Sequence, residues 1–385
     1  MKKINIRKTY LVIILLCVSS CLLAQTFNIG HTSMDFYDNA RNRNITTEIY
    51  YPADSNGDDR PISFGNFPVI VFGHGFLISW DSYDNYWTSL VPEGYILCFP
   101  TTEMGFTPSH QSFADDLIFL TSQMQIESQN STSIFYNSIL PKTGIMGHSM
   151  GGGASFLAAE NNPNINTLIN FAAAETNPSA ISAARNINIP SLIFSGEGDC
   201  VTPPINHQNI MFDSLNSYCK TQINILNGGH CYFANENVLC SFGESSCNPT
   251  LNITRNEQQN ITNDFLKIWL NFSLKSNQNS FTIFNDSLQT SNRITYSQFC
   301  NSTSIINPNK VDEIIIYPNP TKSFIKIIVN EKSNVLIYNS KGEKISENYI
   351  NVGISELNIS DFSKGIYYVN VINKKETSSK KMIVN

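Results

Sequence analysis

Gly147-His148-Ser149-Met150-Gly151 is the stretch that decides the fold expected for this chain. It has the G-x-S-x-G pattern of a nucleophile elbow, a sharp turn from a strand into a helix that exposes a serine hydroxyl. The short apolar run 143–146 before it reads as the end of a buried strand, and glycines 151–153 after it let a helix start close to that strand. Because five residues match by chance in many proteins, the interpretation depends on partners elsewhere in the chain.

Length and composition indicate a globular protein of more than one unit. The 385 residues exceed one ordinary domain. A hydrophobic content of 41% with 15% charged residues indicates a substantial core. The formal net charge of −6 argues against nucleic acid as a partner, because that partner usually requires a basic face.

The N-terminus reads as a secretory signal peptide over residues 1–24. Lysines and an arginine precede the apolar run 11–18, and Leu22-Leu23-Ala24 ends the segment. The apolar run is too short for a stable membrane span. An alternative is lipidation at Cys21, since Val18-Ser19-Ser20-Cys21 resembles a lipobox.

Residues 25–300 alternate between strand-like and helix-like runs, which predicts an α/β sandwich with a mainly parallel sheet. About 20 residues separate the strands that end at Phe171 and begin at Ser191, so there is no room for a lid and an open site is expected. The expected strands are 46–51, 68–72, 95–99, the run before Ser149, 167–171, 191–194 and 222–226, and the clearest helices are 113–125 and 256–271.

The composition changes beyond a polar linker at 301–311. Four lysines occur between Gln25 and Lys275, but eleven occur from Lys310 onward, which marks a second unit over 312–385. Short strand-like runs separated by turns in this unit predict a small all-β sandwich. No residue in it suggests chemistry.

A serine hydroxyl is a weak nucleophile and needs a base that is oriented by an acid. In the expected fold these residues follow in the order serine, acid, histidine. Asp199 follows the strand 191–194, at the sheet edge where catalytic groups gather, and Glu197 is the fallback. His230 follows the next strand and is the preferred base over His207, which reads as the first turn of a helix.

An oxyanion hole requires two backbone donors, one directly after the nucleophile and one on the loop after an earlier strand. These are expected to be the N–H groups of Met150 and Phe76. No metal or cofactor is expected. Residues predicted to line the substrate site are His74, Gly75, Phe76, Trp80 and His148, with Trp87 and Phe106 as further aromatic walls.

Seven cysteines follow the signal peptide, and an odd number leaves at least one unpaired within the chain. Cys98 reads as a buried strand thiol. A bond between Cys200 and Cys231 would join the acid and base loops. Other pairings considered are Cys240–Cys247 and Cys219–Cys300, and the connectivity stays open.

The segment Ile29–Phe272 resembles the lidless α/β-hydrolases of the dienelactone hydrolase, chlorophyllase and polyester hydrolase (cutinase-like) group. The resemblance rests on the nucleophile elbow and on the dipeptides His74-Gly75, Gly198-Asp199 and Gly229-His230. It implies a triad of Ser149, Asp199 and His230. His148 stands where polyester hydrolases usually carry a tryptophan, and the dienelactone hydrolases use a cysteine nucleophile.

The tail resembles the C-terminal sorting domain of the bacterial type IX secretion system. The motifs are Ile316-Tyr317-Pro318-Asn319-Pro320, Val335 to Asn339, Leu357 to Phe362 and Gly365-Ile366-Tyr367. The resemblance implies recognition by that secretion machinery, passage through the periplasm, and release from the cell or attachment to its surface.

Together these features predict a secreted serine hydrolase that cleaves small or polymeric carboxylic esters through an acyl-enzyme, as lipases, cutinases and polyester hydrolases do. A cell-surface binding protein on a hydrolase scaffold and a serine peptidase are the alternatives.

Overall fold

The computed structural model describes residues 26–247, 249, 251–300, 315–317, 321–329, 332–351, 353–373 and 377–384. The chain divides into two compact units, Met1–Asn301 and Ser302–Asn385. The expected signal peptide 1–24, the lipidation alternative at Cys21 and the linker 301–311 lie outside the described residues.

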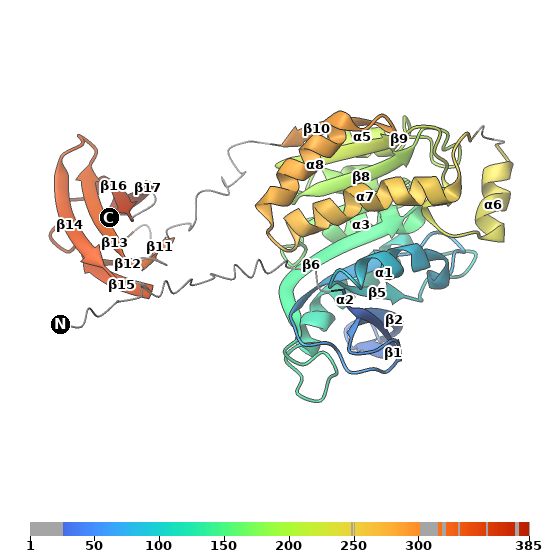
Figure 1. Cartoon of the computed structure of the whole chain (residues 1–385), viewed down its shortest axis with the longest axis horizontal. Helices are drawn as coiled ribbons and strands as arrows, with labels where there is room; N and C mark the ends of the chain where they lie inside the picture. The colour runs from blue at the N-terminus through green and yellow to red at the C-terminus, as the bar shows by residue number, and fades with distance from the viewer. Residues whose placement is uncertain are drawn as a thin grey trace, which may run out of the picture. The chain divides into compact units, whose positions relative to one another are not determined.

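The larger unit is built on one sheet with the strand order β10-β9-β8-β7-β6-β4-β5-β2-β1-β3 (Figure 1). The strands from β9 to β5 run parallel, while β2 joins β5, β1 joins β2 and β10 joins β9 in antiparallel fashion. This mainly parallel sheet confirms the predicted α/β class. The strands are β1 (Asn28–Asp38), β2 (Arg43–Ala53), β3 (Gly57–Asp58), β4 (Phe67–Gly73), β5 (Ile96–Pro100), β6 (Ile139–His148), β7 (Thr167–Phe171), β8 (Ser191–Gly196), β9 (Cys219–Ile225) and β10 (Ile294–Cys300).

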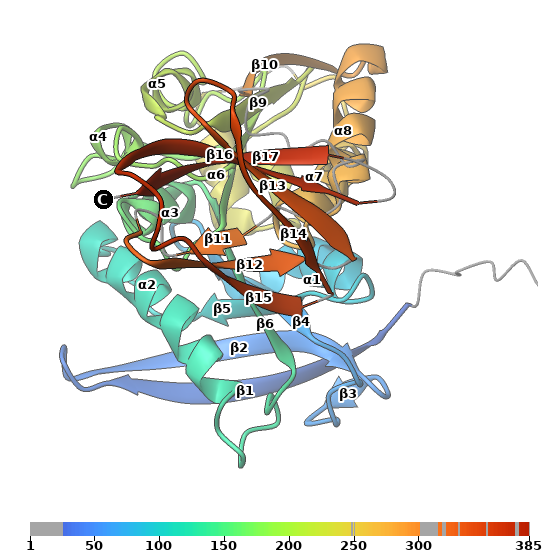
Figure 2. The same ribbon diagram turned by 90° about the vertical axis from the view of Figure 1, so that its left-hand side faces the viewer.

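Helices cover both faces of this sheet (Figure 2). On one face lie α2 (His110–Glu127), α3 (Met150–Ala159), α4 (Ala180–Ala184) and α5 (Gln208–Ser214), and on the other α1 (Asp84–Leu90), α7 (Arg255–Ser273) and α8 (Gln278–Thr290). Every residue of β4, β5 and β7 is buried, as expected for strands covered on both faces. The predicted helices 113–125 and 256–271 fall within α2 and α7, and a capping box of Thr254 and Glu257 starts α7.

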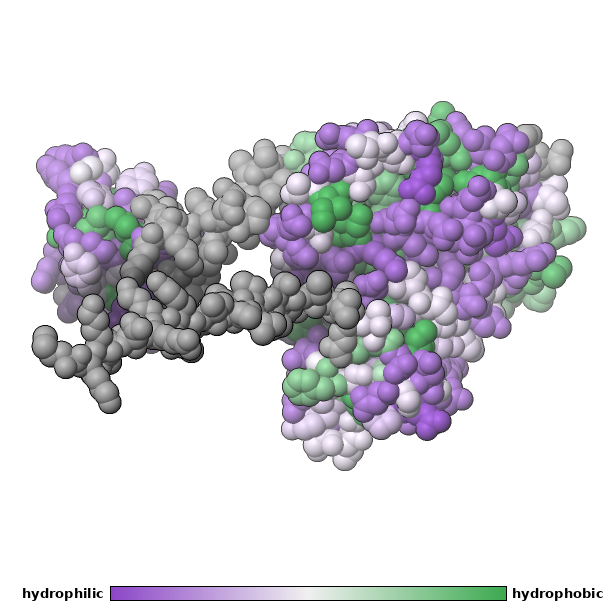
Figure 3. Space-filling model, viewed as in Figure 1, coloured by the Kyte–Doolittle hydropathy of each residue, from purple (hydrophilic) through white to green (hydrophobic). Residues whose placement is uncertain are grey.

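The connection from β7 to β8, residues 172–190, contains only the short α4 and no lid domain. An insertion instead follows the 3-10 turn η2 (Cys231–Phe233), where α6 (Val238–Ser245) stands at the far right of the larger unit in Figure 1. The surface in this view is mostly hydrophilic, with a hydrophobic patch at that right-hand end (Figure 3).

Three disulfides correct part of the expected cysteine pairing. The bonds are Cys200–Cys247, Cys231–Cys240 and Cys219–Cys300. The predicted pairs Cys200–Cys231 and Cys240–Cys247 are wrong, because α6 lies beside both loops and each loop cysteine bonds to one end of it. Cys219–Cys300 is confirmed, since the antiparallel register of β9 and β10 places these two residues opposite each other. Cys98 is a buried free thiol, as predicted.

The smaller unit contains two antiparallel sheets that share one apolar core, which confirms the expected small β domain. Alternating residues such as Ile325 and Ile327 of one sheet and Val335 and Ile337 of the other are buried together. One sheet has the order β11 (Ile315–Tyr317), β12 (Phe324–Val329), β15 (Gly353–Asn358); the other has β14 (Lys344–Ile350), β13 (Ser333–Asn339), β16 (Gly365–Ile372), β17 (Thr377–Val384).

Within the described residues, no helix has both the length and the apolar character required to cross a bilayer.

Candidate active site

Ser149 lies between the end of β6 and the start of α3, with φ 54° and ψ −118°. An L-residue other than glycine rarely adopts a positive φ, and such strain concentrates at functional turns. The motif glycines allow the turn to pack closely. A Cβ on Gly151 would lie 2.1 Å from the carbonyl oxygen of Gly73, and one on Gly147 would lie 2.3 Å from that of Gly151. The G-x-S-x-G spacing therefore reflects two places where no side chain fits.

The structure brings the three predicted triad residues into one hydrogen-bonded chain. Oγ of Ser149 lies 3.0 Å from Nε2 of His230, and Nδ1 of His230 lies 2.9 Å from Oδ2 of Asp199. All three residues are buried, with Ser149 the most exposed at 9%. They come from three loops that follow β6, β8 and β9, whose carboxyl ends meet at one edge of the sheet.

The Asp199 carboxylate is held by a tight turn that the sequence analysis did not identify. Its Oδ1 accepts from the N–H groups of Val201 at 2.9 Å and Thr202 at 2.8 Å. Its Oδ2 accepts from the hydroxyl of Thr202 at 2.8 Å, and that hydroxyl lies 3.0 Å from Nδ1 of His230. Aspartate side chains often accept from backbone N–H groups a few residues further on, so the two backbone partners could have been predicted from the sequence, but the Thr202 hydroxyl could not.

The fallback acid Glu197 and the less favoured base His207 have other partners. Oε2 of Glu197 accepts from the N–H of Asn227, and Nδ1 of His207 accepts from the N–H of Glu175. Neither makes a hydrogen bond to Ser149 or His230 in the described part of the chain.

His148 is fully buried, and its ring connects three parts of the site. Burial holds the pKa of His148 well below its usual value, with the nearby His230 as a second cause, so the ring is neutral. Tyr83, in the 3-10 turn η1 (Trp80–Tyr83), accepts from the N–H of Gly75 at 2.8 Å and donates to Nδ1 of His148 at 2.9 Å. The proton of His148 therefore lies on Nε2, which donates to the carbonyl of His230 at 3.1 Å.

His74 is also buried, with one ring nitrogen 2.8 Å from the carbonyl of Thr102 and the other 2.9 Å from that of Gly75. Burial lowers its pKa, so a neutral ring donates to only one of these carbonyls. The side chains of His74 and His148 were both predicted to line the substrate site. Both side chains are buried, and their ring nitrogens contact the loops after β4 and β5, Tyr83 and the backbone of His230.

Two backbone donors stand free at the predicted oxyanion positions. In the described part of the chain, the N–H groups of Phe76 and Met150 donate to no protein acceptor. The loop after β4 and the turn at Ser149 are in direct contact, as the closeness of Gly73 and Gly151 shows. The side chain of Phe76 is 44% exposed.

The other predicted aromatic walls separate into two groups. Trp80 and Trp87 pack around Tyr50 of β2, with ring centroids 5.9 and 4.1 Å from it, so they belong to an aromatic cluster against the antiparallel edge of the sheet. Phe106, on the loop after β5, is exposed.

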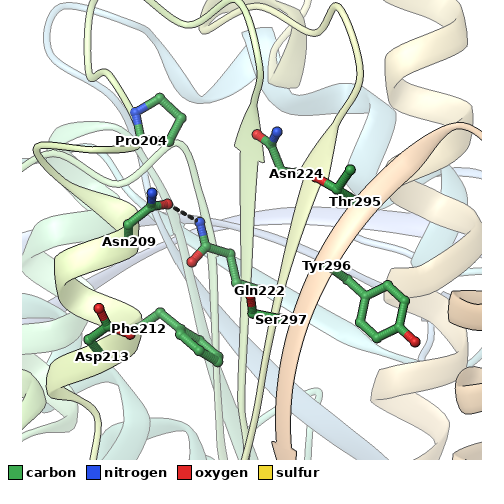
Figure 4. A pocket seen from close by; sticks show the side chains of 9 residues that line it. All are labelled: Pro204, Asn209, Phe212, Asp213, Gln222, Asn224, Thr295, Tyr296 and Ser297. Atoms are coloured by element: carbon green, nitrogen blue, oxygen red, sulfur yellow. Dashed lines mark hydrogen bonds between the residues drawn. The ribbon is translucent and has the colours of Figure 1, made fainter.

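A separate hollow lies between α5 and the strands β9 and β10 (Figure 4). Its lining is mainly amide and hydroxyl side chains, with Phe212 on one wall, and a hydrogen bond joins Gln222 to Asn209. None of the triad residues lines it. Among the described residues, no three His, Cys, Asp or Glu side chains gather to hold a metal ion.

The fold and the serine turn define the class, a serine hydrolase of the α/β-hydrolase type. Residues 42–245, more than half of the chain, match the PET hydrolase-like family, and the chain belongs to that family. Residues 315–385 match the secretion system C-terminal sorting domain. The protein is thus a secreted or cell-surface serine ester hydrolase that carries a type IX sorting tail.

Proposed function

We propose that Ser149 is the nucleophile, His230 the general base and Asp199 the orienting acid of carboxylic ester hydrolysis. The observation that carries this proposal is the unbroken chain of hydrogen bonds from Ser149 Oγ through both ring nitrogens of His230 to Asp199. The proposal also assigns residues 25–300 to the catalytic domain and 312–385 to the sorting domain recognised by the type IX machinery.

In the acylation step, Nε2 of His230 takes the proton of the Ser149 hydroxyl while Oγ attacks the ester carbonyl carbon. The negative charge that forms on the carbonyl oxygen is stabilised by the N–H groups of Phe76 and Met150. The intermediate collapses when the alcohol leaves, taking the proton from His230, and an acyl-Ser149 ester remains.

In the deacylation step, a water molecule replaces the alcohol. His230 removes its proton as the oxygen attacks the acyl carbon, and then returns that proton to Oγ of Ser149. The carboxylic acid is released and the free serine is restored. Asp199 keeps the proton of neutral His230 on Nδ1 and stabilises the imidazolium ion in both steps.

The substrate class that fits best is an ester with an apolar acyl or polymeric body. This inference is supported by membership of the PET hydrolase-like family and by the exposed ring of Phe76 beside a proposed oxyanion donor. The open connection 172–190 leaves access for extended substrates.

The test compares wild type with Ser149→Ala on short p-nitrophenyl esters and with a fluorophosphonate probe, using Ser131→Ala at an exposed serine as the control. We expect Ser149→Ala to lose activity by at least a thousandfold and to lose labelling, while Ser131→Ala retains both. Equal rates for wild type and Ser149→Ala would refute the proposal. An unlabelled wild-type Ser149 would favour a binding protein, and cleavage of peptides in preference to esters would favour a peptidase.

A further inference from the structure

The apolar face of α6 is unusual for the surface of a soluble protein. Val238, Leu239 and Phe242 are 81%, 51% and 75% exposed, and their spacing places them on one side of the helix. Hydrophobic colour at the α6 end of the larger unit is visible in Figure 3. Isolated exposed apolar residues need no explanation, but a contiguous group of large ones marks an interaction surface.

This helix is fixed rigidly to the catalytic loops. Cys240, within α6, bonds to Cys231, which directly follows His230; Cys247, just beyond α6, bonds to Cys200, which directly follows Asp199. The buried carboxylate of Glu244 accepts from the N–H of Cys231 at 3.2 Å. Because an isolated helix of eight residues is unstable in water, these links hold it where it is.

More exposed apolar side chains lie on neighbouring loops at the same edge of the sheet. They follow β4, β5 and β8, the strands whose carboxyl ends meet beside Ser149. Together with the α6 face they form a group that we call the apolar rim: Phe76, Phe106, Ile205, Val238, Leu239 and Phe242.

The lack of exposed charge on the α6 face limits the kind of partner that can bind there. Between Val238 and Ser245 the only ionisable side chain besides the disulfide-bonded Cys240 is Glu244, which is buried, and no lysine or arginine is present. A surface that binds anionic lipid headgroups would carry basic residues. The formal net charge of −6 also opposes an anionic bilayer. The partner that fits is therefore neutral, apolar and extended.

We propose that the α6 face, as the largest part of the apolar rim, adsorbs the enzyme to the solid surface of a neutral polyester and so presents ester groups to Ser149. This inference rests on the proposed function. It assigns to α6 a role in capture of the solid and none in bond cleavage.

The experiment uses the full-length chain with Val238, Leu239 and Phe242 all changed to serine. Adsorption to a polyester film is measured in an inactive Ser149→Ala background, so that it does not depend on turnover. The control replaces three exposed apolar residues away from the rim, Phe64→Ser, Ile126→Ser and Ile283→Ser. Soluble p-nitrophenyl ester rates of the corresponding active variants report folding and intact chemistry.

We expect the α6 variant to lose at least tenfold in film adsorption and in product release from the film, while its rate on the soluble ester stays within twofold of wild type. The control variant should adsorb like wild type. Equal adsorption of the α6 variant and wild type would overturn the inference, as would tighter α6-dependent binding to phospholipid vesicles than to film. If the wild-type enzyme itself shows no activity on the soluble ester, that result refutes the proposed function.

Discussion

The hydroxyl of Tyr83 lies 2.9 Å from Nδ1 of His148, deep inside the larger unit. Because the same oxygen accepts from the N–H of Gly75 and the far nitrogen of His148 donates to the carbonyl of His230, one buried tyrosine connects the loop of the proposed oxyanion donor to the backbone of the proposed base. Buried polar networks of this kind fix geometry only while every member has its partner.

The Tyr83→Phe substitution is therefore expected to slow catalysis, although Tyr83 is buried and is not proposed to contact the substrate. It leaves the N–H of Gly75 and Nδ1 of His148 without partners, which costs about 1–3 kcal/mol for each buried group and lets the loop shift. We expect kcat/KM on a soluble ester to fall about tenfold or more. Tyr95→Phe is the matched control, since it removes a hydroxyl that donates to Asn271 instead. Equal losses of activity in the two variants would contradict the prediction.

The hydroxyl of Thr202 should matter to catalysis through Asp199. Thr202→Val keeps the size of the side chain but removes one of the four donors to the carboxylate, leaving the N–H groups of Val201 and Thr202 and Nδ1–H of His230. We expect kcat to fall roughly tenfold, the effect of losing one hydrogen bond to a charged group, with KM little changed, while Thr202→Ser retains most of the activity because it restores the hydroxyl. Steady-state kinetics on one soluble ester decides between the outcomes; a Val variant as active as the Ser variant would exclude this role.

The buried histidines predict loss of stability in acid. Burial lowers the folded-state pKa of His74 and His148 below the usual value of 6.5, so the unfolded chain binds protons first as the pH falls. The contribution of these two neutral rings to the free energy of unfolding is complete above about pH 6.5. It is lost progressively below that pH, by up to about 1.4 kcal/mol per pH unit for each ring. Denaturant unfolding from pH 8 to pH 5 measures this slope. His148→Gln should be less stable at pH 8 and should show a shallower slope; an unchanged slope would count against a neutral buried ring.

Removal of the Cys219–Cys300 disulfide should affect stability alone. The bond closes a loop with a sequence separation of 81 residues, and it lies at the amino end of β9, the opposite end of that strand from the loop that carries His230. Chain entropy predicts a loss of about 4 kcal/mol in the free energy of unfolding when both cysteines become alanine. Thermal unfolding and ester hydrolysis at 25 °C check this. A lower melting temperature with unchanged kcat is expected, and a drop in kcat for the still-folded variant would show that β10 influences the site.

The sequence sufficed to predict that the three proposed triad residues meet, because the parallel sheet orders its loops in a simple way. Ser149, Asp199 and His230 each follow a recognisable apolar strand, so their meeting at one edge followed from topology. Whether a polar side chain is buried was harder to predict. His74 and His148 are polar residues next to motif glycines, and only the contacts of His148 with Tyr83 and of His74 with the carbonyls of Gly75 and Thr102 show that their rings face inward.

The cysteine pairing failed for a related reason. α6 has its large apolar residues on the outside, so hydrophobic periodicity does not indicate a helix that packs against the loops. Because α6 was not predicted, Cys200 and Cys231 were the expected pair, since they lie on the neighbouring loops of Asp199 and His230. Helix α8 and strand β10 were likewise not predicted, since most of β10 is exposed and lacks the apolar run of an interior strand.

The bond between Cys219 and Cys300 also has a mechanical meaning. Cys300 is the last described residue of the larger unit, and it is joined covalently to the first residue of β9, one strand in from the edge. Tension applied to the chain beyond Cys300 would otherwise unzip the backbone hydrogen bonds of β10 one pair at a time, starting at this end. With the disulfide in place the load passes directly into β9, so a pull on the chain beyond Cys300 is carried by a covalent bond and not by the backbone hydrogen bonds of β10.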